Sequence, residues 1–219
     1  MIRFLNPKRR NGNGTTSWQD AELTPKGEAQ VSALNTFWKN SLRTSKIPIP
    51  QRFYVGPMAR GLSTANTTRS DLPITFSPIV KELLREPINV CTCAWRHPKS
   101  WIQSRYPAYA FEPGFTEEDE LWKRDFVIED TAGLLALTKT LLDDVFATDK
   151  GTFISFTTHG VVIQPILQLI GHPNPSYNPR PGEVIPVLVK AKRNEVVESA
   201  TAANPPTPAK TCSLPGGTP

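Results

Sequence analysis

Long apolar runs do not occur in this sequence of 219 residues, and histidine and cysteine are scarce in it. Because no stretch of about 18 residues is apolar throughout, we expect no membrane-spanning helix. The first residues carry no extended apolar segment of the kind that a secretory signal needs. We therefore expect a cytoplasmic protein without a membrane partner.

The three cysteines are Cys91, Cys93 and Cys212. The Cys-x-Cys spacing of the first two does not match a zinc knuckle, and no second pair is present to complete one. We expect Cys91 and Cys93 to be two reduced cysteines in a loop, and we expect no metal site.

The formal net charge is +5, but the charges are unevenly distributed. All charged residues among the first nineteen are basic, whereas residues 112–120 hold five acidic residues and no basic one. A basic N-terminal segment is compatible with nucleic acid, but no nucleic-acid motif accompanies it. A lining for a small anionic ligand explains the basic segment equally well. The acidic run is typical of a solvated face; the alternative is a lid that repels highly charged substrates.

Hydrophobic periodicity and turn residues predict a series of helices and strands. A helix is expected to start at Thr24 and Pro25, with Thr24 as its N-cap, and to end near Arg43. Further helices are expected from Pro57 to about Arg69, after Asp130, and over residues 161–170, with a short helix or turn over residues 79–85. The expected strands cover residues 2–5, 53–55, 74–76, 153–156 and 183–190.

Strands that alternate with helices predict an α/β fold, a doubly wound and mostly parallel sheet with helices on both faces. We expect one domain over residues 1–190. Residues 87–128 show no clean periodicity and are rich in aromatic residues, which favours a variable loop or lid inserted in this domain. Residues 191–219 are rich in Pro, Thr and Ala, and we expect a disordered tail there.

Two short segments place chemically useful side chains directly after expected strands. The sequence TTHG at residues 157–160 puts His159 between a strand end and a helix start, where free N–H groups favour an anion. The sequence GPMAR at residues 56–60 puts Arg60 in the first turn of a helix, where its planar fork of donors suits phosphate. Taken singly, such a histidine is more often structural and such an arginine is more often solvated.

In their order and spacing, these segments resemble the histidine phosphatase superfamily, which has the phosphoglycerate-mutase-like fold. Residues 23–27 (LTPKG) are similar to the family's LT-x-x-G helix start, and residues 56–65 to its SP-x-x-R…TA block, with Gly56 in place of the serine. Residues 83–86 (LLRE) and 158–160 (THG) look like its acid-bearing segment and its SHG block. The sequence EDELW at residues 118–122 looks like the E-D-E-x-W of a fungal phosphomutase-like branch.

The resemblance implies a phosphomonoester hydrolase that acts on a small phosphorylated metabolite through a phosphohistidine, without a metal ion or a cofactor. It implies that Arg3 and Arg60 bind the phosphate, together with His159 as the second catalytic histidine of the pocket. Glu86 is the implied proton donor to the leaving group. No nucleic-acid partner is expected, and the oligomeric state is left open.

Two further residues compete for roles in the implied pocket. Glu82 lies four residues before Glu86 and is a rival proton donor. Arg96 lies in the variable loop, and we expect it to contact the substrate.

The chain departs from the family at the nucleophile. The family opens with a strand followed by Arg–His, whereas Phe4 follows Arg3 here, and the histidines of the chain are His97, His159 and His172. Three explanations stay open. The protein is a catalytically degenerate binder of a phosphate ligand, or it reuses the pocket for different chemistry with His159 as acid or base. The third is that the sequence begins at a wrong start or exon boundary, so that the true Arg–His segment is missing from it.

Overall fold

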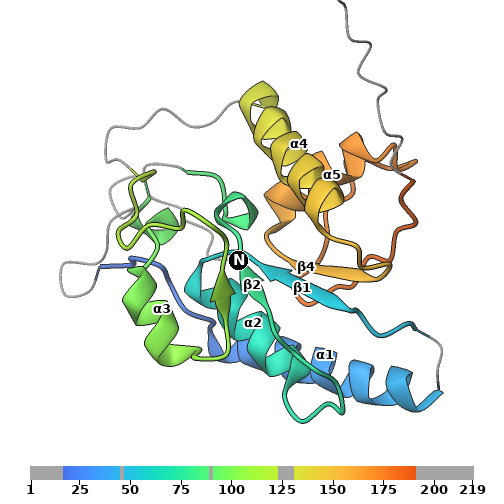
Figure 1. The fold of residues 1–219 in the computed structure, drawn as a ribbon. Coiled ribbons are helices and arrows are strands. Elements are labelled where there is room, and N and C mark those ends of the chain that lie inside the picture. Colours follow the sequence, from blue (N-terminus) through green and yellow to red (C-terminus); the bar gives the residue numbers. More distant parts are fainter. Residues whose placement is uncertain (1–16, 45–46, 89–90, 123–130, 191–219) are drawn as a thin grey trace, which may run out of the picture. The chain divides into compact units, whose positions relative to one another are not determined.

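The computed structural model describes residues 17–44, 47–88, 91–122 and 131–190, and its described strands form one parallel sheet (Figure 1). The strand order is β3-β2-β1-β4. Strand β1 (Arg52–Val55) pairs with β2 (Ile79–Val80) on one side and with β4 (Ile154–Thr157) on the other. Strand β2 also pairs with β3 (Ala110–Phe111), again in parallel. Parallel neighbours place the carboxyl ends of β1, β2 and β4 along one edge of the sheet.

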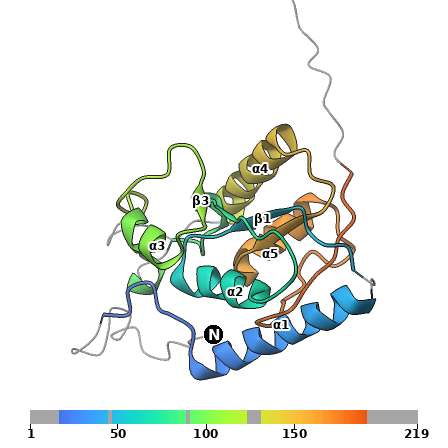
Figure 2. The same ribbon diagram turned by 60° about the horizontal axis from the view of Figure 1, so that its bottom comes forward.

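Helices cover both faces of this sheet. The described helices are α1 (Pro25–Thr44), α2 (Ala59–Arg69), α3 (Lys99–Arg105), α4 (Thr131–Thr148) and α5 (Gly160–Leu169), with the short 3₁₀ helices η2 (Glu82–Leu84) and η3 (Thr92–Ala94). In Figure 2, α4 lies on one side of β1, and α1 and α2 lie on the other.

The core is divided by the sheet because adjacent residues of a strand point to opposite faces. On one face, Val55 packs in a cluster with Leu62 of α2 and Ile102 of α3. On the other face, Tyr54 packs with Leu141 and Val145 of α4. The predicted α/β class, with a parallel sheet and helices on both faces, is therefore confirmed.

Helix α1 begins where the sequence predicts it. The side-chain oxygen of Thr24 accepts a hydrogen bond from the N–H of Gly27 at 3.2 Å, so Thr24 caps the helix. Trp38 is buried, and the buried face also includes Asn35. The Asn35 amide donates to the carbonyl oxygens of Thr68 and Ser70 at 3.1 and 2.8 Å, which ties α1 to the end of α2.

Four sequence predictions about local structure need correction. Residues 74–76 form no strand, and the expected turn over residues 79–85 begins instead with β2, followed by η2. The variable loop also contributes α3 and β3. Residues 183–190 form no strand; among the described residues, β4 pairs only with β1, and this apolar segment does not add to the other edge of β4. The expected strand over residues 2–5 and the expected cap at Asp130 lie outside the described residues.

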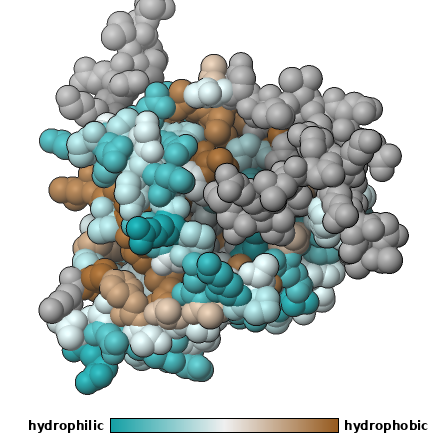
Figure 3. Space-filling model, turned by 180° about the vertical axis from the view of Figure 1, so that it is seen from behind, coloured by the Kyte–Doolittle hydropathy of each residue, from teal (hydrophilic) through white to brown (hydrophobic). Residues whose placement is uncertain are grey.

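The surface of the described fold carries apolar side chains outside the two cores. On the face shown in Figure 3, hydrophobic residues lie in patches between hydrophilic ones. Such a mixture is ordinary, because apolar atoms contribute more than half of the exposed surface of folded proteins. Within the described part of the chain, no helix is both long enough and apolar enough to cross a membrane.

Candidate functional site

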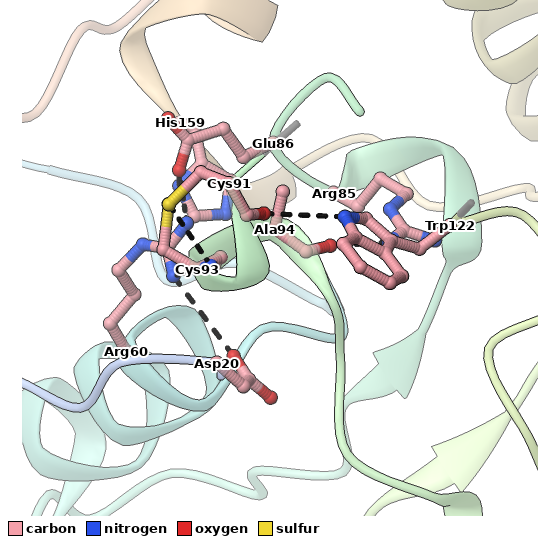
Figure 4. The surroundings of a disulfide bond; sticks show 9 residues. All are labelled: Asp20, Arg60, Arg85, Glu86, Cys91, Cys93, Ala94, Trp122 and His159. Atoms are coloured by element: carbon pink, nitrogen blue, oxygen red, sulfur yellow. Dashed lines mark hydrogen bonds and ion pairs between the residues drawn. A yellow bond between two sulfur atoms is a disulfide. The ribbon is translucent and has the colours of Figure 1, made fainter. Parts of the chain in front are cut away.

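Three of the four residues predicted to form the pocket lie together at the carboxyl edge of the sheet. Arg60 is the second residue of α2 and follows β1, Glu86 follows β2 and η2, and His159 lies between β4 and α5. The guanidinium Nη2 of Arg60 contacts Glu86 Oε2, and His159 Nδ1 lies 3.8 Å from the same oxygen (Figure 4). Parallel pairing of the strands therefore brings together side chains that lie up to 99 positions apart in the sequence.

Gly56 explains how closely these segments approach one another. A Cβ atom at this position would lie 2.3 Å from the carbonyl oxygen of Leu84, so no larger residue fits without a backbone shift. The same oxygen accepts a hydrogen bond from the hydroxyl of Thr158 at 2.7 Å. The ends of β1, η2 and β4 therefore meet at Leu84, two residues before Glu86, and the glycine in place of the family serine fits this contact.

His159 is a neutral imidazole at physiological pH. Burial, together with the positive charges of Arg60 and Arg85, lowers the pKa of His159 well below its usual range. Its Nε2 is buried and has no hydrogen-bond partner among the described residues. A buried polar atom without a partner is uncommon in folded proteins and is typical of a functional group that a ligand or water completes.

Arg60 is held by several acceptors but stays accessible. Its Nη1 donates to the carbonyl oxygen of Cys93 at 3.2 Å and lies 4.0 Å from Asp20 Oδ1. The side chains of Arg60 and Glu86 are 21% and 33% exposed, so a ligand can reach both. A phosphoryl group that binds Arg60 would compete with Glu86 for Nη2, and Glu86 would be released beside it.

Asp20 is a member of this cluster that the sequence reasoning did not find. Its side chain is fully buried. Its Oδ1 accepts from the N–H of Ala59 at 2.8 Å, and its Oδ2 accepts from the N–H of His97 at 3.0 Å. Burial raises the pKa of Asp20, although these two hydrogen bonds oppose the rise. A lone aspartate in a short polar segment reads as solvated, so the sequence carries no local signal for this position.

The turn that holds Cys93 corrects the expectation of free cysteines. Cys91 and Cys93 form a disulfide beside Arg60 and Glu86 (Figure 4). The indole N–H of Trp122 donates to the carbonyl oxygen of Cys91 at 3.2 Å. Its ring stacks on Trp95 with 4.9 Å between centroids. The EDELW segment therefore braces one wall of the candidate site.

Arg96 does not face the site, which corrects the predicted substrate contact. Its side chain is 1% exposed. All of its N–H groups have acceptors: the Glu82 carboxylate, the Thr116 hydroxyl, and the carbonyl oxygens of His97, Thr116, Glu117 and Glu118. Arg96 therefore orders the variable loop, and nothing of its guanidinium is left for a ligand.

Glu82 and Asp119 belong to the same buried ionic network. Glu82 accepts from Arg85 at 2.8 Å and from Arg96 at 3.0 Å. The carboxylate of this rival proton donor is therefore bound to two arginines of the fold. Arg85 also binds both oxygens of Asp119 at 2.9 and 2.7 Å. Burial disfavours the charge on Asp119, but the bonds and charge of Arg85 outweigh it and lower the pKa of Asp119. We call Glu82, Arg85, Arg96 and Asp119 the buried network.

The acidic run over residues 112–120 is only partly a solvated face. Asp119 is buried in the network, and Glu112 binds the ammonium group of Lys81 at 3.2 Å. Glu117 accepts from the backbone N–H of Ser100 at 3.2 Å. Glu112 and Asp119 therefore bind basic side chains of the fold, while Glu117, Glu118 and Glu120 stay exposed, so that part of the run is a solvated face.

The other predicted or singled-out residues lie elsewhere. Arg3 and Phe4 lie outside the described residues, so the predicted phosphate contact of Arg3 stays a prediction. The imidazole of His97 stacks on Trp101 with 3.9 Å between ring centroids. His172 bonds locally with Asn174. Of the three histidines of the chain, His159 is the one that lies against Arg60 and Glu86. We call Asp20, Arg60, Glu86 and His159 the site cluster.

Comparison with known proteins gives one family. A model of the histidine phosphatase superfamily (branch 1) matches residues 7–183. A "probable phosphoglycerate mutase" of Arthroderma benhamiae is 43% identical over 184 residues, which cover 82% of this chain and 54% of that protein. A "phosphomutase-like protein 3" of Candida albicans is 35% identical over 181 residues, which cover 82% of this chain and 55% of that protein. The chain thus spans about half the length of these curated relatives.

One solved structure is similar at low identity. It is the crystal structure of the ecdysone phosphate phosphatase from Bombix mori in complex with tungstate, with 16% sequence identity and a TM-score of 0.43. The match covers 78% of this chain and 64% of that one.

Proposed function

Since the chain belongs to the histidine phosphatase superfamily, we propose that it binds the phosphoryl group of a small phosphomonoester at the site cluster and hydrolyses the ester. The observation that carries this proposal is the meeting of Arg60, Glu86 and a neutral His159 at one edge of the sheet, where the buried Nε2 of His159 has no hydrogen-bond partner among the described residues. A cation, a carboxyl group and an imidazole are the groups that phosphoryl transfer needs. We place this activity in the cytoplasm.

Each residue of the site cluster has a chemical role in the proposal. Arg60 binds two phosphoryl oxygens through its planar fork and neutralises the charge that develops on them. Glu86, displaced from Arg60 and protonated from solvent, gives that proton to the leaving oxygen as the P–O bond breaks. The neutral His159 accepts the proton of the attacking water, so that inorganic phosphate and an alcohol are the products.

A second candidate is a phosphate-binding protein without turnover. It is favoured by Phe4, which stands where the family resemblance places the nucleophilic histidine. The site cluster can bind an oxyanion without this histidine, because binding needs only the cation and the hydrogen-bonding groups. The two candidates differ in turnover and agree in phosphate binding.

The test is a phosphatase assay on the purified chain with p-nitrophenyl phosphate and a panel of phosphomonoesters, near pH 5 and pH 7. We expect turnover by the unaltered chain and its loss in His159→Ala, whereas His172→Ala keeps it. Turnover that persists in His159→Ala would contradict the proposed mechanism. Thermal protection by phosphate without any turnover favours the second candidate. Turnover gained in Phe4→His then identifies position 4 as the site of the absent nucleophile.

A further inference from the structure

Asp20 joins three segments of the described fold through hydrogen bonds of its backbone and its carboxylate. Its backbone N–H donates to the carbonyl oxygen of Thr92 at 3.2 Å, its Oδ1 accepts from Ala59 and its Oδ2 accepts from His97. Its backbone adopts a positive φ of 44°, which aspartate tolerates better than most residues. The segment before α1 is thereby fixed to the start of α2 and to the turn between residues 91 and 97.

Both of the other segments determine where the Arg60 guanidinium lies. Ala59 directly precedes Arg60, so the bond to Ala59 fixes the backbone from which the side chain extends. Cys93 lies in the turn bounded by the Thr92 and His97 contacts, and its carbonyl oxygen accepts from Arg60 Nη1. The carboxylate of Asp20 itself lies 4.0 Å from that nitrogen.

The two ends of the Arg60 fork are therefore held differently. Nη2 is held by Glu86, whose side chain is 33% exposed and has to leave when a phosphoryl oxygen binds. Nη1 is held by the Cys93 carbonyl and by the fully buried Asp20. When Glu86 leaves, the Nη1 side is what keeps the guanidinium oriented.

We propose that Asp20 is a positioning residue for the phosphate clamp: it fixes both the Arg60 backbone and the carbonyl that orients Nη1. This inference rests on the proposed phosphate binding at the site cluster. It predicts an effect opposite in sign to simple electrostatics. Removal of a buried negative charge beside an anion site should by itself tighten anion binding. Loss of positioning should weaken anion binding instead, because a mobile guanidinium has to be ordered by the ligand.

The test compares Asp20→Asn with Asp149→Asn by isothermal titration with inorganic phosphate. Asp149 is a matched control, since its buried carboxylate accepts from the Tyr54 hydroxyl at 2.6 Å and from the Gly151 N–H at 2.7 Å, with Arg52 at 3.4 Å. It lies by the opposite edge of the sheet, beside Arg52 at the start of β1. Each substitution removes one charge. In Asp20→Asn one of two backbone N–H groups faces the amide NH2, whereas in Asp149→Asn the amide oxygen can keep the Gly151 N–H and the NH2 faces the Tyr54 hydroxyl.

We expect Asp20→Asn to raise the phosphate Kd about tenfold and Asp149→Asn to leave it unchanged, while both lower the midpoint of urea unfolding. A phosphate Kd that stays the same or falls in Asp20→Asn would overturn the role of Asp20 alone. No phosphate binding by the unaltered chain overturns the proposed function and this inference with it.

A second variant serves if Asp20→Asn does not fold. Ala59→Pro removes the N–H that Asp20 Oδ1 accepts and adds ring atoms at a buried position, and proline suits the first position of a helix. The preceding residue, Met58, already has the extended conformation (ψ 137°) that a following proline requires. We expect a severalfold rise in the phosphate Kd; an unchanged Kd in a folded Ala59→Pro protein counts against the proposal.

Discussion

The buried network and the site cluster lie next to each other, and their arginines are held in opposite ways. Arg96 is 1% exposed, and all of its N–H groups donate to protein acceptors. Arg60 is 21% exposed and contacts the Glu86 carboxylate with Nη2 and the Cys93 carbonyl oxygen with Nη1. Arg85 and Glu86 are adjacent in sequence, yet the first belongs to the network and the second to the cluster.

The difference separates structural from functional charge. A buried ion whose hydrogen-bonding groups all have protein partners has none left for a ligand. Its removal leaves those partners without hydrogen bonds. Arg60 is partly exposed and lies beside an imidazole whose Nε2 has no hydrogen-bond partner among the described residues, so it can bind a ligand, and its removal costs the fold little. The Nε–H of Arg85 is the exception in the network, because it has no partner among the described residues.

The largest effects are expected from replacing Arg96 of the buried network and Arg60 of the site cluster. Arg96→Met should lower the free energy of unfolding by about 3–5 kcal/mol, because it leaves the Glu82 carboxylate and several carbonyl oxygens of the loop without the guanidinium that donates to them. Arg60→Met should lower it by less than about 1 kcal/mol and should abolish measurable phosphate binding. Urea unfolding and titration with phosphate measure the two quantities. The reverse pattern, in which Arg60→Met unfolds the protein and Arg96→Met spares it, would refute the distinction.

An intermediate effect is expected where the network and the cluster meet, at Leu84. Gly56→Ala should destabilise the fold by about 1–3 kcal/mol, because the new Cβ would lie 2.3 Å from the Leu84 carbonyl oxygen. Gly61→Ala is the matched control in stability, since its Cβ would meet no atom closer than 3.6 Å. Chemical unfolding of the two variants checks this, and equal stability of both would contradict the close contact.

The smallest effect concerns the pH dependence of stability. The folded state lowers the pKa of His159, so between its usual pKa of 6.5 and its folded value the unfolded chain binds a proton that the folded chain does not. Stability should therefore fall as the pH drops below 6.5, by up to about 1.4 kcal/mol per pH unit for this one group. His159→Gln should remove this part of the slope and His172→Gln should keep it. Urea unfolding between pH 7.5 and pH 5.5 measures both slopes, and identical slopes would show that His159 titrates normally.

Local signals predicted the elements that local interactions specify. Thr24 and Pro25 mark the start of α1, the periodicity of residues 161–170 marks α5, and the apolar runs mark β1 and β4. The two-residue strands β2 and β3 escaped prediction because so short a strand has no period of its own. Its pairing is set by the neighbouring strand.

The sequence by itself determined that Arg60, Glu86 and His159 would meet. Arg60 and His159 each follow an expected strand, and the edge of a parallel sheet gathers such residues. Glu86 was placed beside them by the family resemblance, because the strand that precedes it, β2, was not predicted. It also determined the absence of a histidine beside Arg3.

Only the tertiary structure decided which charged residues of the loops point inward. Arg96, Asp119 and Asp20 carry no local pattern, and their acceptors and donors lie as far as 77 positions away in the sequence. Whether a charged side chain is buried depends on the partners that folding brings to it, because an unpaired charge stays in water and a fully bonded one does not. The sequence lists the charges, and the packing of distant loops against the sheet edge decides which of them stay free for a ligand.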